Sequence, residues 1–157
     1  MTPNYAFNYF SRFYSIPEDT INKRREMLFK TFGIDQFQEV KYGDLSTGMK
    51  QKTSIAVSLC QDPDIVVFDE PTNGLDIITA RQVTDYLTEL KNRGKTVIIS
   101  THLMSLVEKL CDRVLMIIDG ESILEEKVPE LLNEYPGKDL EEIFFEIYYK
   151  KRGAKNE

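Results

Sequence analysis

The feature that most constrains the fold is a continuous apolar run, Ile65-Val66-Val67-Phe68, which ends in two acids, Asp69 and Glu70. A run without polar alternation is typical of a strand buried on both faces, as the strands of parallel sheets are. A helical pattern follows over residues 78–92, and a second buried strand is predicted over residues 95–100. Strand, helix and strand in this order predict an α/β fold with a parallel sheet and right-handed crossovers.

The rest of the chain extends this pattern with helices and one hairpin, whose turn is predicted at Asp119-Gly120. The other expected elements are helices over residues 4–14, 16–32, 46–60 and 104–110, strands over residues 113–118 and 122–124, and two helices around Pro136-Gly137. The first helix carries an aromatic stripe that we interpret as core packing, formed by Tyr5, Phe7, Phe10, Phe13 and Tyr14.

Composition and charge exclude several classes of protein. The 157 residues are 41% hydrophobic and 29% charged, which fits one soluble globular domain and argues against disorder. A formal charge of −6 makes the chain a poor candidate for sequence-independent nucleic-acid binding, which needs a basic surface. No apolar run approaches about 20 residues, the length of a membrane-spanning helix. Cys60 and Cys111 lie in apolar patterns, so we expect buried thiols in a reducing compartment.

The acidic pair at the end of the first strand is the strongest local signal for chemistry. Two adjacent carboxylates beside a buried strand are costly unless something occupies them, and ligands of open α/β sheets bind at the carboxyl ends of strands. Asp69 could hold Mg²⁺ there, and Glu70 could orient or activate a water molecule. The alternative is two solvated turn acids, and the pair alone does not separate the two interpretations.

Three further features are weaker when taken singly. His102 follows the second strand and could contact a phosphate or polarise an attacking water. Ser46 and Gly48 stand at the start of a predicted helix, where a hydroxyl and backbone amides can bind an anion. The alternative for these two is an ordinary capped helix. Asp76 follows a turn-rich link and by itself is only a helix N-cap candidate.

Together these features form four motifs in one order: LSTGMKQK at 45–52, DIVVFDE at 64–70, PTNGLD at 71–76 and ISTH at 99–102. They resemble the signature motif, Walker B, D-loop and switch histidine of ABC-transporter ATPase domains. The resemblance is clear over residues 1–124, and both ends are similar to the export-type group that pairs with separate drug, sodium or peptide permeases. It implies an incomplete P-loop NTPase (RecA-like) core with an N-terminal helical subdomain.

The resemblance also implies a division of the chain and a role for each acidic or basic site residue. Residues 1–60 would be the helical subdomain with the signature motif, residues 61–125 a partial core, and residues 126–157 the C-terminal helices and tail. Asp69 would hold Mg²⁺ through water, and Glu70 would be the general base for the attacking water. His102 would contact the γ-phosphate of ATP.

The signature motif would bind ATP held by a second nucleotide-binding domain. The resemblance assigns Ser46, Thr47 and Gly48 to that ATP contact, and Asp76 to the link between the two composite sites of the dimer. Lys52 replaces the family's arginine and keeps the charge but not the planar fork. Two other positions depart from the family pattern, because Thr47 replaces a glycine and Met49 replaces a glutamine. The two departures bear on the strength of the phosphate contact.

The 157 residues contain no GxxxxGK[ST] phosphate-binding loop. In the family this loop comes upstream, so we expect a Walker-A-bearing half as a partner, beside a membrane permease and a second nucleotide-binding domain. The chain would then work on ATP and Mg²⁺ at the cytoplasmic side of the membrane, and alone it would hydrolyse none. The missing strand would leave unpaired strand edges on either side of a gap in the sheet.

Two other functions stay open. The chain could be an inactive, truncated ABC fragment that docks on a full-length ATPase or permease and regulates it. The aromatic positions that offer surface for docking are Phe7, Phe10, Phe13, Phe144, Phe145 and Tyr148. A weaker alternative is an ABC protein that acts on ribosomes or in DNA repair. The net charge of −6 argues against this alternative. Gly74 also argues against it, because the ribosome-acting group usually carries histidine at that position.

Overall fold

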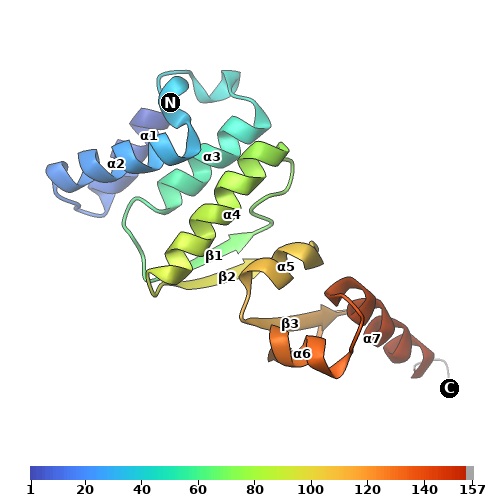
Figure 1. Cartoon of the computed structure of the whole chain (residues 1–157). Helices are drawn as coiled ribbons and strands as arrows, with labels where there is room; N and C mark the ends of the chain where they lie inside the picture. The colour runs from blue at the N-terminus through green and yellow to red at the C-terminus, as the bar shows by residue number, and fades with distance from the viewer. Residues whose placement is uncertain (155–157) are drawn as a thin grey trace. The chain divides into compact units, whose positions relative to one another are not determined.

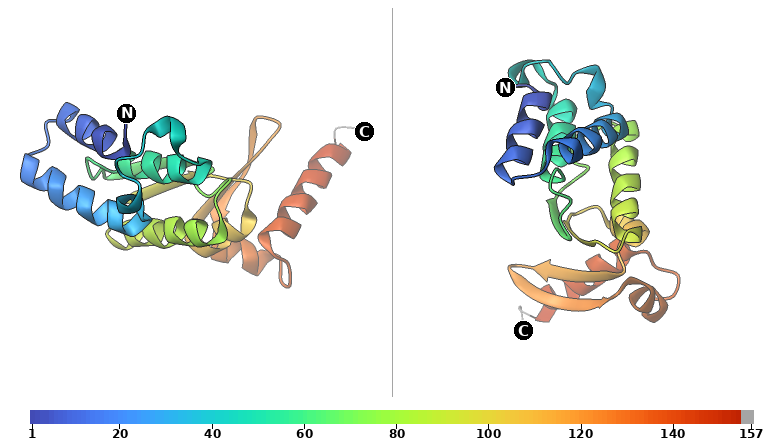
Figure 2. Two further views of the ribbon diagram at one scale, coloured as in Figure 1. Left: turned by 90° about the horizontal axis from the view of Figure 1, so that it is seen from above. Right: turned by 90° about the vertical axis from the view of Figure 1, so that its left-hand side faces the viewer.

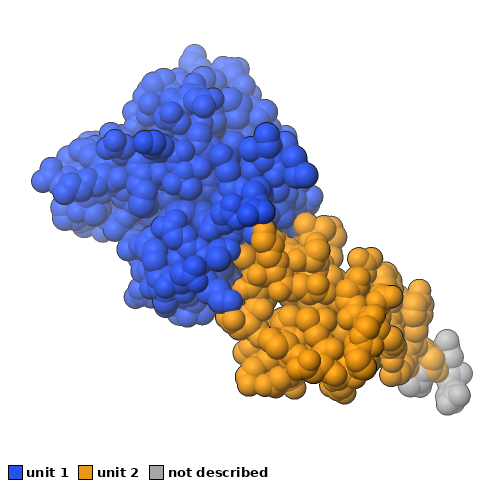
Figure 3. Space-filling model, in the orientation of Figure 1, with its two compact units in different colours: residues 1–100 blue, residues 101–157 orange. Residues whose placement is uncertain are grey.

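The computed structural model describes residues 1–154, and the last three residues of the expected tail lie outside this range. The chain divides into two compact units, unit 1 over residues 1–100 and unit 2 from residue 101 onward (Figure 3). No helix within residues 1–154 combines the length and the apolar character needed to cross a membrane.

Unit 1 is mainly helical around one pair of strands (Figure 1). Its elements are α1 (Pro3–Phe13), α2 (Glu18–Phe32), η1 (Ile34–Gln36), η2 (Tyr42–Asp44), α3 (Thr47–Ser58), β1 (Ile65–Asp69), α4 (Ile77–Asn92) and β2 (Thr96–Ser100). These bounds confirm the expected elements to within a few residues. Gly33 ends α2 in the left-handed conformation, with φ of 65°, as a C-terminal glycine cap does.

The core of unit 1 forms where aromatic rings from separate helices meet. The rings of Phe7 in α1 and Phe29 in α2 lie edge to face, with their centroids 5.5 Å apart. Phe32 in α2 meets Tyr86 in α4 in the same way at 5.2 Å. Phe7 and Phe32 are fully buried, so these contacts fix α1 and α4 against α2.

The prediction that the whole aromatic stripe of α1 packs in the core is wrong. Of its members only Phe7 is buried, and Tyr5 and Phe13 are 60% and 72% exposed. The buried side of α1 is completed by small residues, Pro3, Ala6 and Ser11. Small side chains on the buried side of α1 allow the close approach of α3. The larger rings of Tyr5 and Phe13 lie on the exposed side of the helix.

The two strands of unit 1 are parallel, with Val67 opposite Ile98 and Asp69 opposite Ser100. Val66 and Phe68 are buried on the side that faces the helices, and α4 contacts β2. Ile65 and Val67 point to the other side and are exposed. The prediction of a strand buried on both faces is therefore wrong for one face.

A cluster of ion pairs ties the turn before β1 to the neighbouring helices. Asp62 accepts from Arg93 at 3.2 Å and lies 3.4 Å from Lys95 Nζ and 3.9 Å from Arg24. Lys95 also bonds Asp64 at 2.9 Å. The cluster therefore joins the segments that enter β1 and β2 to α2 and α4.

Unit 2 consists of a β-hairpin and helices (Figures 1 and 2). Its elements are α5 (Met104–Leu110), β3 (Arg113–Ile118), β4 (Glu121–Lys127), α6 (Val128–Glu134) and α7 (Leu140–Ala154). Asp119 and Gly120 both have positive φ, 54° and 77°, which confirms the predicted tight hairpin turn. Within residues 1–154, β1 and β2 form one two-stranded sheet and β3 and β4 form another.

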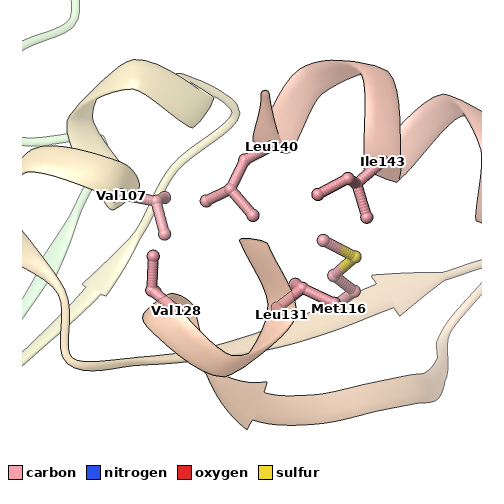
Figure 4. Close-up of a cluster of buried hydrophobic side chains, with 6 residues drawn as sticks. All are labelled: Val107, Met116, Val128, Leu131, Leu140 and Ile143. Carbon is pink, nitrogen blue, oxygen red and sulfur yellow. The ribbon is translucent and has the colours of Figure 1, made fainter. Parts of the chain in front are cut away.

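The core of unit 2 is a compact cluster between the hairpin and its helices (Figure 4). Its members are Val107, Met116, Val128, Leu131, Leu140 and Ile143, each at most 8% exposed. A hydrogen bond supports the cluster at its edge, since the Leu140 amide donates to Glu108 Oε1 at 2.6 Å.

Candidate functional site

The first part of the candidate site is the start of α3. Ser46 is the N-cap of this helix, and its hydroxyl oxygen accepts from the Met49 amide at 3.2 Å. Leu45 is buried just before it and anchors the loop. Ser46 and Thr47 are exposed, while Gly48 is half-buried in the first turn, where backbone amides have no partner within the helix. A capped helix start of this kind suits an anion.

The second part is the carboxyl end of β1. Asp69 is the last residue of the strand and is exposed beside Ser100. The Glu70 amide donates to the Ser100 carbonyl at 2.8 Å, so the pairing continues one residue beyond the strand. Glu70 has a φ of 47°, a left-handed conformation that turns the chain sharply after the strand. The Asn73 amide then donates to the Glu70 carbonyl at 3.1 Å and closes a tight turn.

The third part is Asp76, the N-cap of α4. Its Oδ1 accepts from the Ile78 and Thr79 amides, each at 3.0 Å, and its Oδ2 accepts from the Thr79 hydroxyl at 2.6 Å. The hydrogen bonds from Thr79 hold the pKa of Asp76 below its ordinary value, and the Ile78 amide and the Lys52 ammonium lower it further. Asp76 is thus a fixed, negatively charged cap.

The fold brings the start of α3 and the turn before α4 into contact. A β-carbon placed on Gly48 would lie 3.8 Å from Leu75 Cδ2, and one on Gly74 would lie 4.0 Å from Thr47 Cγ2. These are ordinary van der Waals distances, so the two motifs pack together. Gly74 has a φ of 71°, which explains why glycine suits the turn at this contact.

His102 belongs to unit 2, where it is exposed just before α5. Beside it, the Leu103 amide donates to the Thr101 hydroxyl oxygen at 3.1 Å. The contact of His102 with a γ-phosphate stays a prediction, as do the roles of Asp69 and Glu70.

A magnesium ion would have to be held by few protein ligands. No group of three or more His, Cys, Asp or Glu side chains within residues 1–154 could hold a metal ion. Magnesium sites in ATPases use one or two carboxylates with the substrate's phosphates and water. The exposed carboxylate of Asp69 fits that donor set.

One residue that supports the site, Thr79, was not singled out from the sequence, whereas Lys52 belongs to the predicted signature motif. Thr79 donates hydrogen bonds to both carboxylate oxygens of Asp76, and the positive charge of Lys52 lowers the pKa of that carboxylate. The signal for Thr79 was present, because a hydroxyl three residues after an N-cap aspartate can complete the cap. The effect of Lys52 on the pKa of Asp76 could not be predicted from the sequence, because it requires the Lys52 ammonium to approach the start of α4.

Comparison with known proteins decides the family. A family model described as "AAA domain, putative AbiEii toxin, Type IV TA system" matches residues 6–108. The chain is 40% identical over 144 residues to the ABC transporter ATP-binding protein NatA of Bacillus subtilis, covering 92% of this chain and 58% of that protein. The chain belongs to this AAA-domain family, and its homologues include ABC-transporter ATP-binding proteins.

Other relatives agree with this family. The chain is 36% identical over 135 residues to the Nod factor export ATP-binding protein I of Ralstonia nicotianae, covering 86% of the chain and 42% of that protein. A solved structure described as an ATP binding subunit of an ABC transporter matches with a TM-score of 0.87 at 23% identity, over 94% of this chain and 62% of that one. The ABC-type fold and the resemblance are thereby confirmed, and the chain spans about half the length of the curated relatives it matches.

Proposed function

We propose that this ABC-type chain is part of an ATPase that drives export through a separate membrane permease. The observation that carries the proposal is the contact between the start of α3 and the turn before α4, through Thr47 and Gly74. It joins the signature motif and Asp76 in one unit, while Asp69 and Glu70 stand at the end of β1 in the same unit. A chain with no use for nucleotide has no need for these motifs together.

Each residue would act on the nucleotide from a fixed backbone. The Ser46 hydroxyl can still donate its own proton to a phosphate oxygen, beside the free amides of the first turn of α3. Glu70 would take the proton of the attacking water, and His102 would contact the γ-phosphate. Bound Mg²⁺, held through Asp69, would neutralise charge on the phosphate oxygens.

The partners follow from the same proposal. A second nucleotide-binding domain would hold the ATP that Ser46, Thr47 and Gly48 contact, with Asp76 linking the two sites. A segment with a GxxxxGK[ST] loop would cradle the phosphates, because the 157 residues contain none. We also propose the division into residues 1–60, 61–125 and 126–157 as functional segments, at the cytoplasmic face of a membrane beside the permease and without a nucleic-acid partner.

The test is ATP hydrolysis by the chain alone and with the part of Bacillus subtilis NatA that lies outside the match, which we expect to carry the phosphate loop. We expect no turnover by the chain alone and Mg²⁺-dependent turnover by the pair. Glu70→Gln should lower that turnover about 100-fold or more, the usual effect of losing a general base. Turnover by the chain alone that Glu70→Gln abolishes would contradict the need for a second segment.

An inactive docking module is the second candidate, favoured by the exposed rings of α1. Phe13 is 72% exposed and Tyr9 is 54% exposed. An open depression of about 630 Å³ lies at the start of the same helix, lined by Met1, Thr2, Asn4, Tyr5, Asn8 and Glu39. If the pair shows no turnover, yet the chain alters hydrolysis by intact NatA and Phe13→Ser removes that effect, this candidate replaces the first.

A further inference from the structure

The last helix, α7, has two faces of opposite character. Along one face Leu140 and Ile143 are fully buried and point into the cluster of unit 2 (Figure 4). Near the other end of the helix, the Lys151 ammonium donates to the Ile118 carbonyl at 2.8 Å, beside the hairpin turn. Both ends of this face are therefore held, which fixes the direction in which the opposite face points.

The opposite face of α7 exposes aromatic rings. Phe145 and Tyr149 are 44% and 65% exposed, and their rings stack with the centroids 6.1 Å apart. Tyr148 lies beside Tyr149, edge to face at 5.5 Å, and the Arg152 guanidinium lies 4.8 Å from the centre of the Tyr148 ring. Residues three or four apart share one side of a helix, so Glu141, which is exposed, precedes these rings on the same face. We name these five residues the aromatic face.

The charges of the aromatic face are ordered along the helix. The Glu141 carboxylate stands at its start, the rings lie in the middle, and the Arg152 guanidinium stands at its end. A second α7 that runs antiparallel presents the same order in reverse. Each Glu141 would then meet Arg152 of the other copy, and the rings would pack between the two ion pairs. A parallel pair would instead place like charges together, so the face is complementary to itself across a two-fold axis.

The neighbouring basic residues favour a protein partner over an anionic lipid surface. Lys150 pairs with Glu146 at 2.6 Å and Lys151 with Glu121 at 2.7 Å, so both ammonium groups already have carboxylate partners. Attraction to anionic lipid needs a cluster of several Lys or Arg side chains. A negatively charged membrane would also repel Glu141 on the aromatic face. A second copy of the chain satisfies both the acid and the base of the face.

We propose that α7 is a dimerisation helix whose aromatic face packs antiparallel on α7 of a second copy of this chain, without nucleotide. The contact goes beyond the proposed function, because the composite sites proposed there are joined by ATP. The 15 residues of α7 span about 22 Å, so the contact is small beside the roughly 1,200–2,000 Å² of a stable interface. We therefore expect a dimer that forms in the micromolar range and separates on dilution.

The test is sedimentation equilibrium of the 157-residue chain in the absence of ATP and Mg²⁺. We expect Tyr149→Glu to raise the dissociation constant of the dimer at least tenfold, because a carboxylate would be buried among aromatic rings. Tyr149 is 65% exposed in the single chain, so the variant should fold as the parent does, which circular dichroism checks. Tyr5→Glu is the matched control, since Tyr5 of α1 is 60% exposed and receives the same change. We expect it to dimerise as the parent chain does.

An exchange of charges tests the antiparallel order of the two helices. Glu141→Arg alone and Arg152→Glu alone should each raise the dissociation constant about fivefold, because each places like charges at both ends of the contact. The double variant that carries both changes should dimerise about as tightly as the parent, because the two ion pairs form with exchanged signs. Both changes oppose the helix dipole, so a purely structural effect would add up in the double variant and would not be reversed.

The proposal fails if the parent chain stays monomeric at every concentration reached, if Tyr149→Glu dimerises as tightly as the parent, or if Tyr5→Glu weakens the dimer equally. A double charge variant that dimerises more weakly than both single variants would also overturn it. A monomeric chain that co-sediments with phosphatidylserine-containing vesicles, and loses this binding in Tyr149→Glu, would make a membrane surface the occupant instead. None of these measurements uses ATP, so failure of the dimer and failure of the proposed ATPase function are observed separately.

Discussion

Unit 1 and unit 2 each contain a two-stranded sheet, but the two sheets present different surfaces to water. The outer face of β1–β2 is lined by Ile65, Val67 and Ile98, with one carboxylate at its end. The exposed side of the β3–β4 hairpin carries Leu115 and Ile117 among charged residues.

The charged residues of the hairpin explain the difference. Leu115 lies opposite Glu125, and Arg113 lies opposite Lys127. Arg113 also pairs with Glu125 at 3.0 Å. Charges on an edge or exposed strand discourage association with other chains, and antiparallel sheets tolerate one wet face. The comparison teaches that similar exposure can have different surroundings: Leu115 of the hairpin lies opposite a charged residue, whereas Val67 of the parallel pair lies opposite the apolar Ile98.

The largest expected effect comes from the core of unit 1. Phe32→Ala removes the ring that meets Tyr86, and should lower the free energy of unfolding by about 3–5 kcal/mol. Met27→Ala, at an exposed position of the same helix, should change it by less than about 0.5 kcal/mol. Urea unfolding followed by circular dichroism measures both. Similar values for the two variants would show that the helical core does not hold unit 1 together.

The core of unit 2 should respond almost as strongly although this unit is smaller. Leu131 is fully buried in the cluster beneath the hairpin, so Leu131→Ala should cost about 2–5 kcal/mol. Amide exchange of β3 and α7 measures the loss. If exchange at these elements is unchanged, the hairpin owes its stability to its own strand pairing, and the comparison of the two cores breaks down.

A smaller effect sharpens the comparison of the two exposed sheet faces. Val67→Thr with Ile98→Thr should lower the binding of an apolar fluorescent dye more than Leu115→Thr with Ile117→Thr does. Each single change at these exposed positions should alter stability by no more than about 0.5 kcal/mol. Equal losses of dye fluorescence would mean that the charges of the hairpin do not distinguish its surface.

The smallest effect concerns one carboxyl group in each unit. Hydrogen bonds from Lys138, then Lys150, lower the pKa of Glu146 from 4.5 to about 2. Its pKa is depressed in the folded state, so its stabilising contribution is full above about pH 4.5 and is lost as pH falls through 2. Asp76 also has a lowered pKa, but mainly through hydrogen bonds from Thr79.

Salt separates these two carboxyl groups. Added salt screens the lysines and should raise the pKa of Glu146 toward its ordinary value, while Asp76 should change less. Side-chain NMR titration at low and high ionic strength measures both, and Glu146→Gln should lack the corresponding acid-dependent loss of stability. An equal response of both groups to salt would show that the cap of α4 depends on surface charge as well.

Local sequence was sufficient for most of the fold. Helix caps, the turn at Asp119-Gly120 and the apolar runs act over a few residues, so the elements could be predicted almost to their ends. The burial of individual side chains could not be predicted, because it depends on which other segments of the fold pack against them. The exposure of Val67 and Phe13 depends on which segments pack beside them, and residues far away in sequence decide that.

The candidate site divides in the same way. The motifs around Ser46, Glu70 and Asp76 could be found in the sequence because each is a continuous stretch. The contact of Thr47 with Gly74 could not, because it requires two loops to approach in space. The burial of Cys60 was predicted correctly, whereas Cys111 is only partly buried.

At Glu70 the side chain and the backbone have opposing requirements, because the left-handed conformation favours glycine whereas the residue is a glutamate. A side chain other than glycine or asparagine costs about 1–2 kcal/mol in that conformation. Under the role proposed for Glu70, a lineage released from hydrolysis would be free to exchange this glutamate for glycine, which relieves the backbone strain. Retention of a carboxylate at this strained position is therefore a consequence that the proposed function predicts for relatives that hydrolyse ATP.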